Sequence, residues 1–268
     1  METFGYDGIR GALEGCGWAD RVRFFQTVDS TNNLAKKLAR DGAPEGTVLV
    51  ADCQTGGRGS RGRSFLSPGG MGIYLSVILR PDCFPEDCMH LTCGAAVAVC
   101  RALERYGFRP GIKWTNDIVI ERHKVCGILT EIAVNPETGR LSHAVVGIGI
   151  NCRQRREDFP PALQSFAGSL QMFSGVQVDR NGIAAALIRE LERLRASLHT
   201  RKGELLDAYR ARCVTIGQEV SVVRGDRVFH AKALAVDDDG GLLVEREDGS
   251  RETVASGEVS VRGMYGYS

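Results

Sequence analysis

The sequence lacks several features that would place it in a common class of protein. No Cys-x-x-Cys pair occurs and the chain has five histidines, so the usual ligands of a structural zinc site are missing. No basic segment followed by an apolar one opens the chain, and the longest apolar stretch, residues 95–100, is far too short to cross a bilayer. We therefore expect a soluble protein with no membrane partner.

An excess of charge of one sign is also lacking. The 34 basic and 33 acidic residues leave a net charge of +1, so no global field draws the protein to nucleic acid, and any basic site must be local. The nine cysteines are odd in number and follow no secretion signal. We expect a cytoplasmic protein whose cysteines are mostly small buried apolar residues.

The composition is that of an ordinary globular protein. Hydrophobic residues make up 43% of the chain and charged residues 25%, and neither repeats nor low-complexity segments occur. A chain of 268 residues is long enough for one large domain and a small one. The pattern changes near residue 215, which predicts domains over residues 1–215 and 216–268.

Residues 1–20 are rich in glycine and weakly patterned, so they are expected to form a loose arm. A helix-turn-helix needs two patterned helices in about 20 residues, and this arm does not supply them. The sequence therefore predicts no DNA-binding domain and no DNA partner.

Helical and strand patterns alternate between residues 30 and 212. Asp29 and Ser30 are expected to cap a helix from Thr31 to Arg40 that Gly42 closes. Residues 53–71 read as a long loop, and Lys124 is placed in a turn over residues 122–124. Strands are predicted over residues 47–51, 73–79, 111–114, 118–121, 125–133 and 141–150, and helices over 89–106, 183–198 and 204–212.

The last 50 residues have the pattern of a small all-β barrel. Turns are predicted at Gly225-Asp226, Asp239-Gly240 and Asp248-Gly249. They separate five short strands, at residues 218–223, 227–236, 241–246, 251–255 and 258–262. The chain as a whole is thus predicted to be α+β, with a mixed or antiparallel sheet, helices and a small β-barrel.

The strongest local signal is the glycine–arginine segment over residues 54–63. It offers backbone N–H groups and guanidiniums that suit a phosphate or a carboxylate. Gly57, Gly59 and Gly62 match the dinucleotide pattern G-x-G-x-x-G, and the segment nearly matches a P-loop. Both templates need a helix to open there, which Pro68 and the glycines after it prevent. A solvated basic loop is the alternative.

Two further clusters are modest when taken singly. Residues 113–117 and 123–127 are dense in polar side chains around short strands, although a lone turn lysine is usually a solvated surface residue. Gly147 and Gly149 alternate within a strand and so share one sheet face. Such glycines indicate close approach either of a ligand or of a tightly packed helix.

In this order and spacing, the motifs resemble those of the biotin–protein ligase family. The resemblance runs from about residue 24 to the C-terminus. It implies a class II synthetase-like catalytic domain over residues 1–215 and an SH3-like barrel over 216–268, in the form of the family without an N-terminal DNA-binding domain, so no repressor activity is expected. The matching segments are residues 30–32, 54–63, 113–117, 124–127, 147–151 and 256–262.

The resemblance also implies a role for each matched residue. Lys124, Arg58 and Asp117 would carry the chemistry, with Asp117 as a general base or orienter for the acceptor lysine. Biotin contacts are implied for Ser30, Thr31, Asn32, Gln54, Gly57, Arg58, Gly59, Ser60, Lys124, Gly127 and Gly147. Contacts to ATP or the adenylate are implied for Arg61, Arg63, Phe65, Asn116 and Asn151.

The sequence departs from the family pattern at three positions. Ser60 stands where well-known members carry an arginine associated with retention of the adenylate, which puts retention in doubt. Thr115 replaces a usual proline and still permits an extended strand. Phe65 replaces a common tryptophan and keeps an aromatic surface.

The expected reaction is ATP-dependent formation of biotinyl-5'-AMP, followed by transfer of biotin to a lysine of a biotin carboxyl carrier protein. No metal ligand is predicted in the chain, because Mg²⁺ would arrive on the nucleotide phosphates. The protein could be a monomer or a homodimer. The alternatives are a lipoate–protein ligase or octanoyl transferase of the same fold, a non-catalytic biotin sensor, and a nucleic-acid-binding module.

Overall fold

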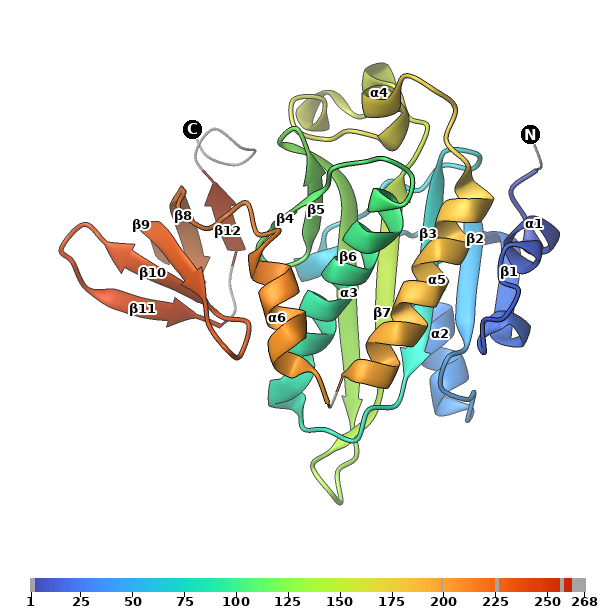
Figure 1. Ribbon diagram of the computed structural model, residues 1–268, viewed down its shortest axis with the longest axis horizontal. Helices are drawn as coiled ribbons and strands as arrows, with labels where there is room; N and C mark the ends of the chain where they lie inside the picture. The colour runs from blue at the N-terminus through green and yellow to red at the C-terminus, as the bar shows by residue number, and fades with distance from the viewer. Residues whose placement is uncertain (1–2, 199, 225–226, 256–257, 262–268) are drawn as a thin grey trace.

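A seven-stranded sheet forms the centre of the molecule (Figure 1). The computed structural model describes residues 3–198, 200–224, 227–255 and 258–261. The strand order is β1-β2-β3-β7-β6-β5-β4; β1 and β2 run parallel, and the other neighbouring pairs run antiparallel. The predicted α+β class with a mixed sheet is therefore confirmed.

The strands of this sheet lie close to their predicted positions, with one exception. The strand β1 was not predicted, because its residues mix charged, polar and aromatic side chains without clean alternation, and it is an edge strand held by pairing with β2. The bounds are β1 Val22–Val28, β2 Val48–Gln54, β3 Gly72–Leu79, β4 Gly111–Lys113, β5 Asp117–Ile120, β6 His123–Val134 and β7 Leu141–Asn151.

The predicted helices are present, and short ones join them. Ser30 caps α2, its hydroxyl accepting a hydrogen bond from Asn33 N, as its sequence position predicted. The α-helices are α1 Tyr6–Gly11, α2 Thr31–Arg40, α3 Cys88–Glu104, α4 Leu170–Ser174, α5 Arg180–Ser197 and α6 Lys202–Arg210. The 3₁₀ turns are η1 Ala19–Arg21, η2 Ser60–Gly62, η3 Pro85–Asp87, η4 Arg156–Asp158 and η5 Pro161–Leu163.

The prediction of a loose N-terminal arm was wrong for the part that the structure describes. Ile9 and Leu13 are fully buried, and α1 packs against α5 and β1. The Phe4 ring lies over the Arg180 guanidinium, with 3.9 Å between its centroid and Cζ. Because its few apolar side chains have a place between two other elements, the segment is ordered without a strong periodicity of its own.

The two faces of the sheet are covered unequally. Helices α3 and α5 pack together over one face and enclose the main core (Figure 1). On the other face, α2 buries Ala35 and Ala39 against Leu49, Ile78 and Val145 of β2, β3 and β7. The neighbouring part of that face, at β6 and the end of β7, carries Gly127, Gly147 and Gly149 in place of large side chains. It is this part that leaves room for a site.

The five predicted C-terminal strands form an antiparallel sheet of order β11-β10-β9-β8-β12. The predicted turn at residues 225–226 and the ends of the 256–262 motif lie outside the described residues. The indole Nε1 of Trp114 donates to Gly240 O at 2.9 Å, so the sheet docks onto the larger part of the molecule. The bounds are β8 Glu219–Arg224, β9 Arg227–Val236, β10 Leu242–Arg246, β11 Arg251–Val254 and β12 Glu258–Val261.

The cysteines agree with the expectation that most of them are small buried residues. All eight cysteines that the structure describes in full are free, and all but Cys53 are buried. Burial raises the pKa of the Cys93, Cys100 and Cys152 thiols to about 12, so they stay neutral. Within the described ranges, the helices are all too short or too polar to span a membrane.

Candidate active site

A polar hollow opens where the uncovered face of the sheet meets the loop over residues 55–71. Its walls come from the start of α2, from this loop, from Asn116, and from β6 and β7. Twelve of the predicted site residues line it: Ser30, Thr31, Asn32, Gln54, Arg58, Gly59, Ser60, Phe65, Asn116, Lys124, Gly127 and Gly147. The fold thus brings together residues from motifs that lie far apart in the sequence.

The deep end of the hollow is a fixed hydrogen-bond network. Gln54 Oε1 accepts from Thr31 N at 2.9 Å and from Thr31 Oγ1 at 3.1 Å, while its Nε2 donates to Ser67 Oγ at 2.9 Å. Ser76 Oγ lies 2.6 Å from Asn32 Oδ1 and 2.8 Å from Thr31 Oγ1. These polar groups are satisfied by one another, so their orientations are set before any ligand binds.

The floor of the hollow is a patch of glycines on adjacent strands. Gly127 of β6 and Gly149 of β7 are register partners, and the Phe65 ring lies over both. A Cβ added at Gly127 would lie 3.4 Å from that ring, and one added at Gly149 would lie 2.5 Å from it. A Cβ at Gly147 would overlap the Asn32 amide of α2. The reading of a tightly packed helix holds at Gly147, where a side chain of α2 packs, whereas the Phe65 ring packs at Gly149. The reading of a close ligand stays a prediction.

Lys124 and Asp117 form an ion pair beside this floor, with 2.6 Å between Nζ and Oδ1. The prediction that Lys124 lies in a turn was wrong, because it is in β6 and the turn is formed by Glu121 and Arg122. The φ angles of these two residues are 47° and 68°, a conformation that glycine and asparagine favour. With neither residue type present at these two positions, the turn was predicted slightly too late, over residues 122–124.

A second, apolar hollow of about 310 Å³ adjoins the first. It contains the predicted site residues Arg63, Asp117 and Asn151, and it shares Gly59, Ser60, Phe65 and Lys124 with the polar hollow. Its remaining walls were not predicted: Ser64, Leu66, Phe159, Leu163, Phe166 and Ala167. Phe159, Leu163, Phe166 and Ala167 lie in the proline-containing loop after β7. Their apolar side chains were the sequence signal for this wall, but their spacing lacks the periodicity of a helix or strand.

The loop after β7 is tied to the lysine by main-chain bonds. Lys124 N donates to Phe166 O at 2.7 Å, and Gly168 N donates to Lys124 O at 2.9 Å. Asn151 is 6% exposed, and its Nδ2 donates to Gly168 O at 3.0 Å. Asn151 therefore supports the wall of the apolar hollow through an internal hydrogen bond.

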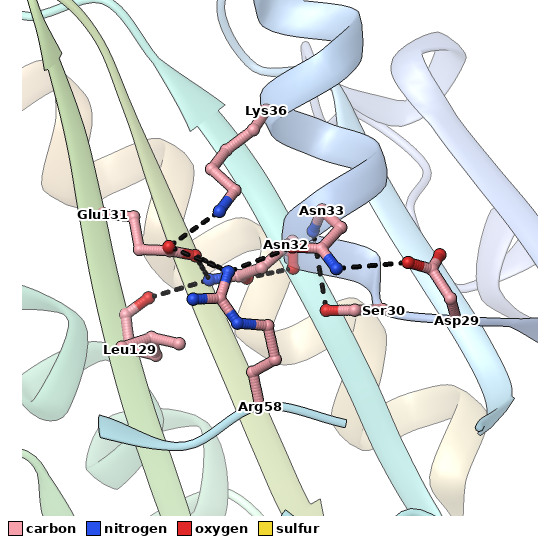
Figure 2. Close-up of polar contacts among 9 residues, drawn as sticks. Asp29, Ser30, Asn32, Asn33, Lys36, Arg58, Leu129 and Glu131 are labelled. Atoms are coloured by element: carbon pink, nitrogen blue, oxygen red, sulfur yellow. Dashed lines mark hydrogen bonds and ion pairs between the residues drawn. The ribbon is translucent and has the colours of Figure 1, made fainter. Parts of the chain in front are cut away.

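The loop arginines take separate positions. Arg58 reaches across to Glu131 of β6 and to Asn33 of α2 (Figure 2). Arg63 bonds to Ser60 within the loop and lines the apolar hollow. Gly57 lies outside both hollows, where a Cβ would meet Ser67 Oγ at 2.5 Å, and the Arg61 side chain is outside the described set.

The residues around the hollows suit a metal ion carried on a ligand rather than a protein cage. Among the residues that the structure describes, no three His, Cys, Asp or Glu side chains are grouped to hold a metal. Asp117 is the carboxylate that lines the apolar hollow, and it faces Lys124. A nucleotide-borne Mg²⁺ fits this setting, because its phosphates supply most of the oxygen ligands.

Comparisons with known proteins match both parts of the chain. The biotin/lipoate A/B protein ligase family matches residues 24–151, and the biotin protein ligase C-terminal domain matches residues 215–262. The chain is similar to the bifunctional ligase/repressor BirA of Bacillus spizizenii, with 38% identity over 231 residues, which cover 85% of this chain and 70% of that protein.

Two further similarities agree with this match. The biotin–[acetyl-CoA-carboxylase] ligase of Mycobacterium tuberculosis is 32% identical over 251 residues, covering 91% of this chain and 90% of that one. The solved biotin protein ligase from Aquifex aeolicus in complex with biotin and ATP superposes with a TM-score of 0.75 at 29% identity, covering 90% of this chain and 98% of that one. By sequence and by fold, this chain belongs to the biotin protein ligase family.

Proposed function

We propose that this chain activates biotin with ATP and transfers the biotinyl group to a lysine of a biotin carrier protein. The observation that carries the proposal is the meeting of two unlike hollows at one lysine. The polar hollow and the apolar hollow share Lys124, which is paired with Asp117. A ligand in each would present its reactive group to the same ammonium.

The polar hollow suits the ring system of biotin. A cyclic urea needs a donor and an acceptor in fixed positions, which the buried Ser30, Thr31 and Asn32 offer at the start of α2. The glycine floor and the Phe65 ring give flat surfaces for the apolar part of the ligand. The carboxylate at the end of the valeryl chain would then point towards Lys124.

The apolar hollow suits the adenine base. Phe65, Phe159 and Phe166 supply aromatic surface, and Arg63 supplies a cation at its edge for a phosphate. The resemblance in sequence assigned Phe65 to the nucleotide, and its place between the hollows lets it contact both substrates.

In the first step, a biotin carboxylate oxygen attacks the α-phosphorus of ATP and the bond to the bridging oxygen of pyrophosphate breaks. Two anions must approach each other, so the barrier is largely electrostatic and positional. Lys124 would offset this repulsion at the point of contact, and Mg²⁺ on the phosphates supplies further positive charge. The loop over residues 55–71 would shield the mixed anhydride from water.

In the second step, the carrier lysine attacks the acyl carbon and AMP leaves. A free lysine has a pKa of about 10.4 and is largely protonated at neutral pH, so it must lose a proton to react. We assign Asp117 as the acceptor of that proton, because it lines the apolar hollow beside Lys124.

The decisive experiment uses purified protein with ATP, Mg²⁺ and either biotin or lipoate, with and without a biotin carrier domain. Pyrophosphate release with biotin, together with the mass shift of one biotinyl group on the carrier, is the expected result. Turnover with lipoate alone would favour the lipoate ligase alternative. Tight biotin binding without turnover would instead favour the sensor.

Three further expectations belong to this proposal. A domain boundary near residue 215 agrees with the span of the matched C-terminal family, 215–262. Free cysteines agree with a reducing, cytoplasmic location. Gel filtration with and without biotin and ATP would distinguish a monomer from a homodimer.

A further inference from the structure

Glu131 gathers two side chains of α2, Asn32 and Lys36, and one side chain of the glycine–arginine loop, Arg58 (Figure 2). It lies in β6, seven residues beyond Lys124, and its side chain is 20% exposed. Its carboxylate accepts from Lys36 Nζ at 2.7 Å, from Asn32 Nδ2 at 3.0 Å, and from Arg58 Nη1 at 2.9 and 3.2 Å. None of the motifs that carry the family resemblance includes Glu131.

The carboxylate is held as an anion between two cations. Burial by itself raises the pKa of Glu131, but the hydrogen bonds from Lys36 and Asn32, with the charges of Lys36 and Arg58, bring the net pKa below its usual range. The Lys36 and Arg58 side chains are 29% and 40% exposed. The cluster is thus less screened by water than a fully exposed ion pair.

Two of the three partners are predicted to touch the substrate. Asn32 presses against Gly147 at the floor of the polar hollow, and Glu131 and Ser76 fix its amide from opposite ends. Arg58 sits between Gly57 and Gly59 in the loop, and its guanidinium bonds to Glu131 and to Asn33 Oδ1 at 3.0 Å. One carboxylate therefore contacts both the loop, through Arg58, and the floor of the polar hollow, through Asn32.

We propose that Glu131 is a positioning residue of this enzyme: through Arg58 it holds the glycine–arginine loop closed over biotin and the adenylate, and through Asn32 it orients the biotin-binding end of the hollow. The inference rests on the ligase function proposed above. It also gives the loop a means of closure that does not depend on an arginine at position 60, where this chain has Ser60.

The test compares Glu131→Gln with Lys36→Gln in the full chain. The Glu131→Gln variant keeps a hydrogen-bond acceptor but loses the charge that attracts Arg58. We expect about a tenfold increase in the KM for biotin and about a tenfold faster release of adenylate into solution, because one charge-assisted bond is lost. The rate of transfer from preformed adenylate at saturation should change by less than about twofold. Lys36→Gln removes another partner of the same carboxylate without touching the loop, and should leave all three nearly unchanged.

Two measurements keep the proposal separate from a general loss of structure. Trypsin should cleave the loop after its arginines faster in Glu131→Gln than in Lys36→Gln, with cleavage elsewhere unchanged. The double variant Arg58→Gln with Glu131→Gln should raise the KM for biotin by less than the product of the two single effects, because the two residues share the Arg58–Glu131 contact.

Several results would overturn the inference. An unchanged KM for biotin in Glu131→Gln would mean that the Arg58–Glu131 pair does not affect biotin binding. A lowered KM would mean that Glu131 competes with the substrate for Arg58. Additive effects in the double variant, or uniform proteolysis along the chain, would reduce Glu131 to a role in stability. If the unaltered protein releases no pyrophosphate with biotin, it is the proposed function that fails, while the loop proteolysis still reports on Glu131.

Discussion

The Nζ atom of Lys124 lies 2.6 Å from Oδ1 of Asp117, and Lys124 lines both hollows of the active site. The two residues are on adjacent antiparallel strands joined by a two-residue turn, so their spacing is set by the sheet and not by a flexible loop.

Replacing Lys124 with alanine should impair the first half-reaction. The ammonium is the cation at the meeting point of the two hollows, and removing such a preorganised charge typically slows a reaction between anions by about a hundredfold or more. Biotin-dependent pyrophosphate release without carrier measures this step. Unchanged release would remove Lys124 from the mechanism.

Asp117→Asn should slow transfer more than adenylate formation. Asparagine cannot accept the proton of the carrier lysine, and loss of a general base commonly costs about 10²- to 10⁴-fold in rate. Supplying preformed biotinyl-adenylate and carrier isolates the second step. Equal slowing of both steps would mean that Asp117 acts by orienting Lys124.

Ser60→Arg should lengthen the lifetime of the bound adenylate. Ser60 lies in both hollows, so an arginine there would reach the phosphate of the adenylate. A hydrogen bond from a charged group contributes roughly 1.5–3 kcal/mol, which corresponds to about a tenfold or greater decrease in release. The appearance of free biotin and AMP without carrier reports the release. If the adenylate is released as fast as before, closure of the loop already limits its release, whatever residue stands at position 60.

Gly240→Ala should undock the C-terminal sheet and lower turnover. Gly240 has φ 83°, its carbonyl accepts from Trp114, and a Cβ there would meet Met89 Cγ at 2.6 Å. Gly249→Ala is the matched control, because its φ is 81° and a Cβ there meets nothing within 4 Å.

The control carries only the cost of a left-handed conformation, about 1–2 kcal/mol. Gly240→Ala adds the steric overlap and the loss of a buried hydrogen bond beside Lys113 and Asn116. Proteolysis of the C-terminal sheet and kcat for transfer should both change more in Gly240→Ala. Equal changes in proteolysis and in kcat for the two variants would show that docking of the C-terminal sheet does not affect the active site.

Asp52→Asn should destabilise the fold strongly. Asp52 pairs with Arg180 at 2.5 Å, and the two side chains are 11% and 3% exposed. Breaking a buried pair leaves an uncompensated charge and costs about 3–5 kcal/mol in the free energy of unfolding. Asp82→Asn breaks the Arg140 pair, in which Asp82 is 85% exposed, and should cost less than about 1 kcal/mol. Urea denaturation compares them, and similar losses would contradict the structure.

Local patterns were enough to predict most of the elements and the chemistry. The Ser30 cap, the C-terminal hairpins and the glycine-rich loop each depend on residues that are neighbours in the chain. Short segments of sequence are therefore enough to predict them. The resemblance of these motifs to a known family further implied biotin, ATP and a central lysine. These conclusions needed no knowledge of which strands pair.

What only the tertiary structure decided are the contacts between distant segments. Arg58 and Glu131 are 73 residues apart, and Phe166 reaches Lys124 from a loop without periodicity. The N-terminal arm is ordered because α5 and β1 offer it a surface, and Lys124 is in a strand because Glu121 and Arg122 adopt a turn that their side chains do not favour. In each case the stabilising free energy comes from burial and pairing across the fold, which no local sequence pattern encodes.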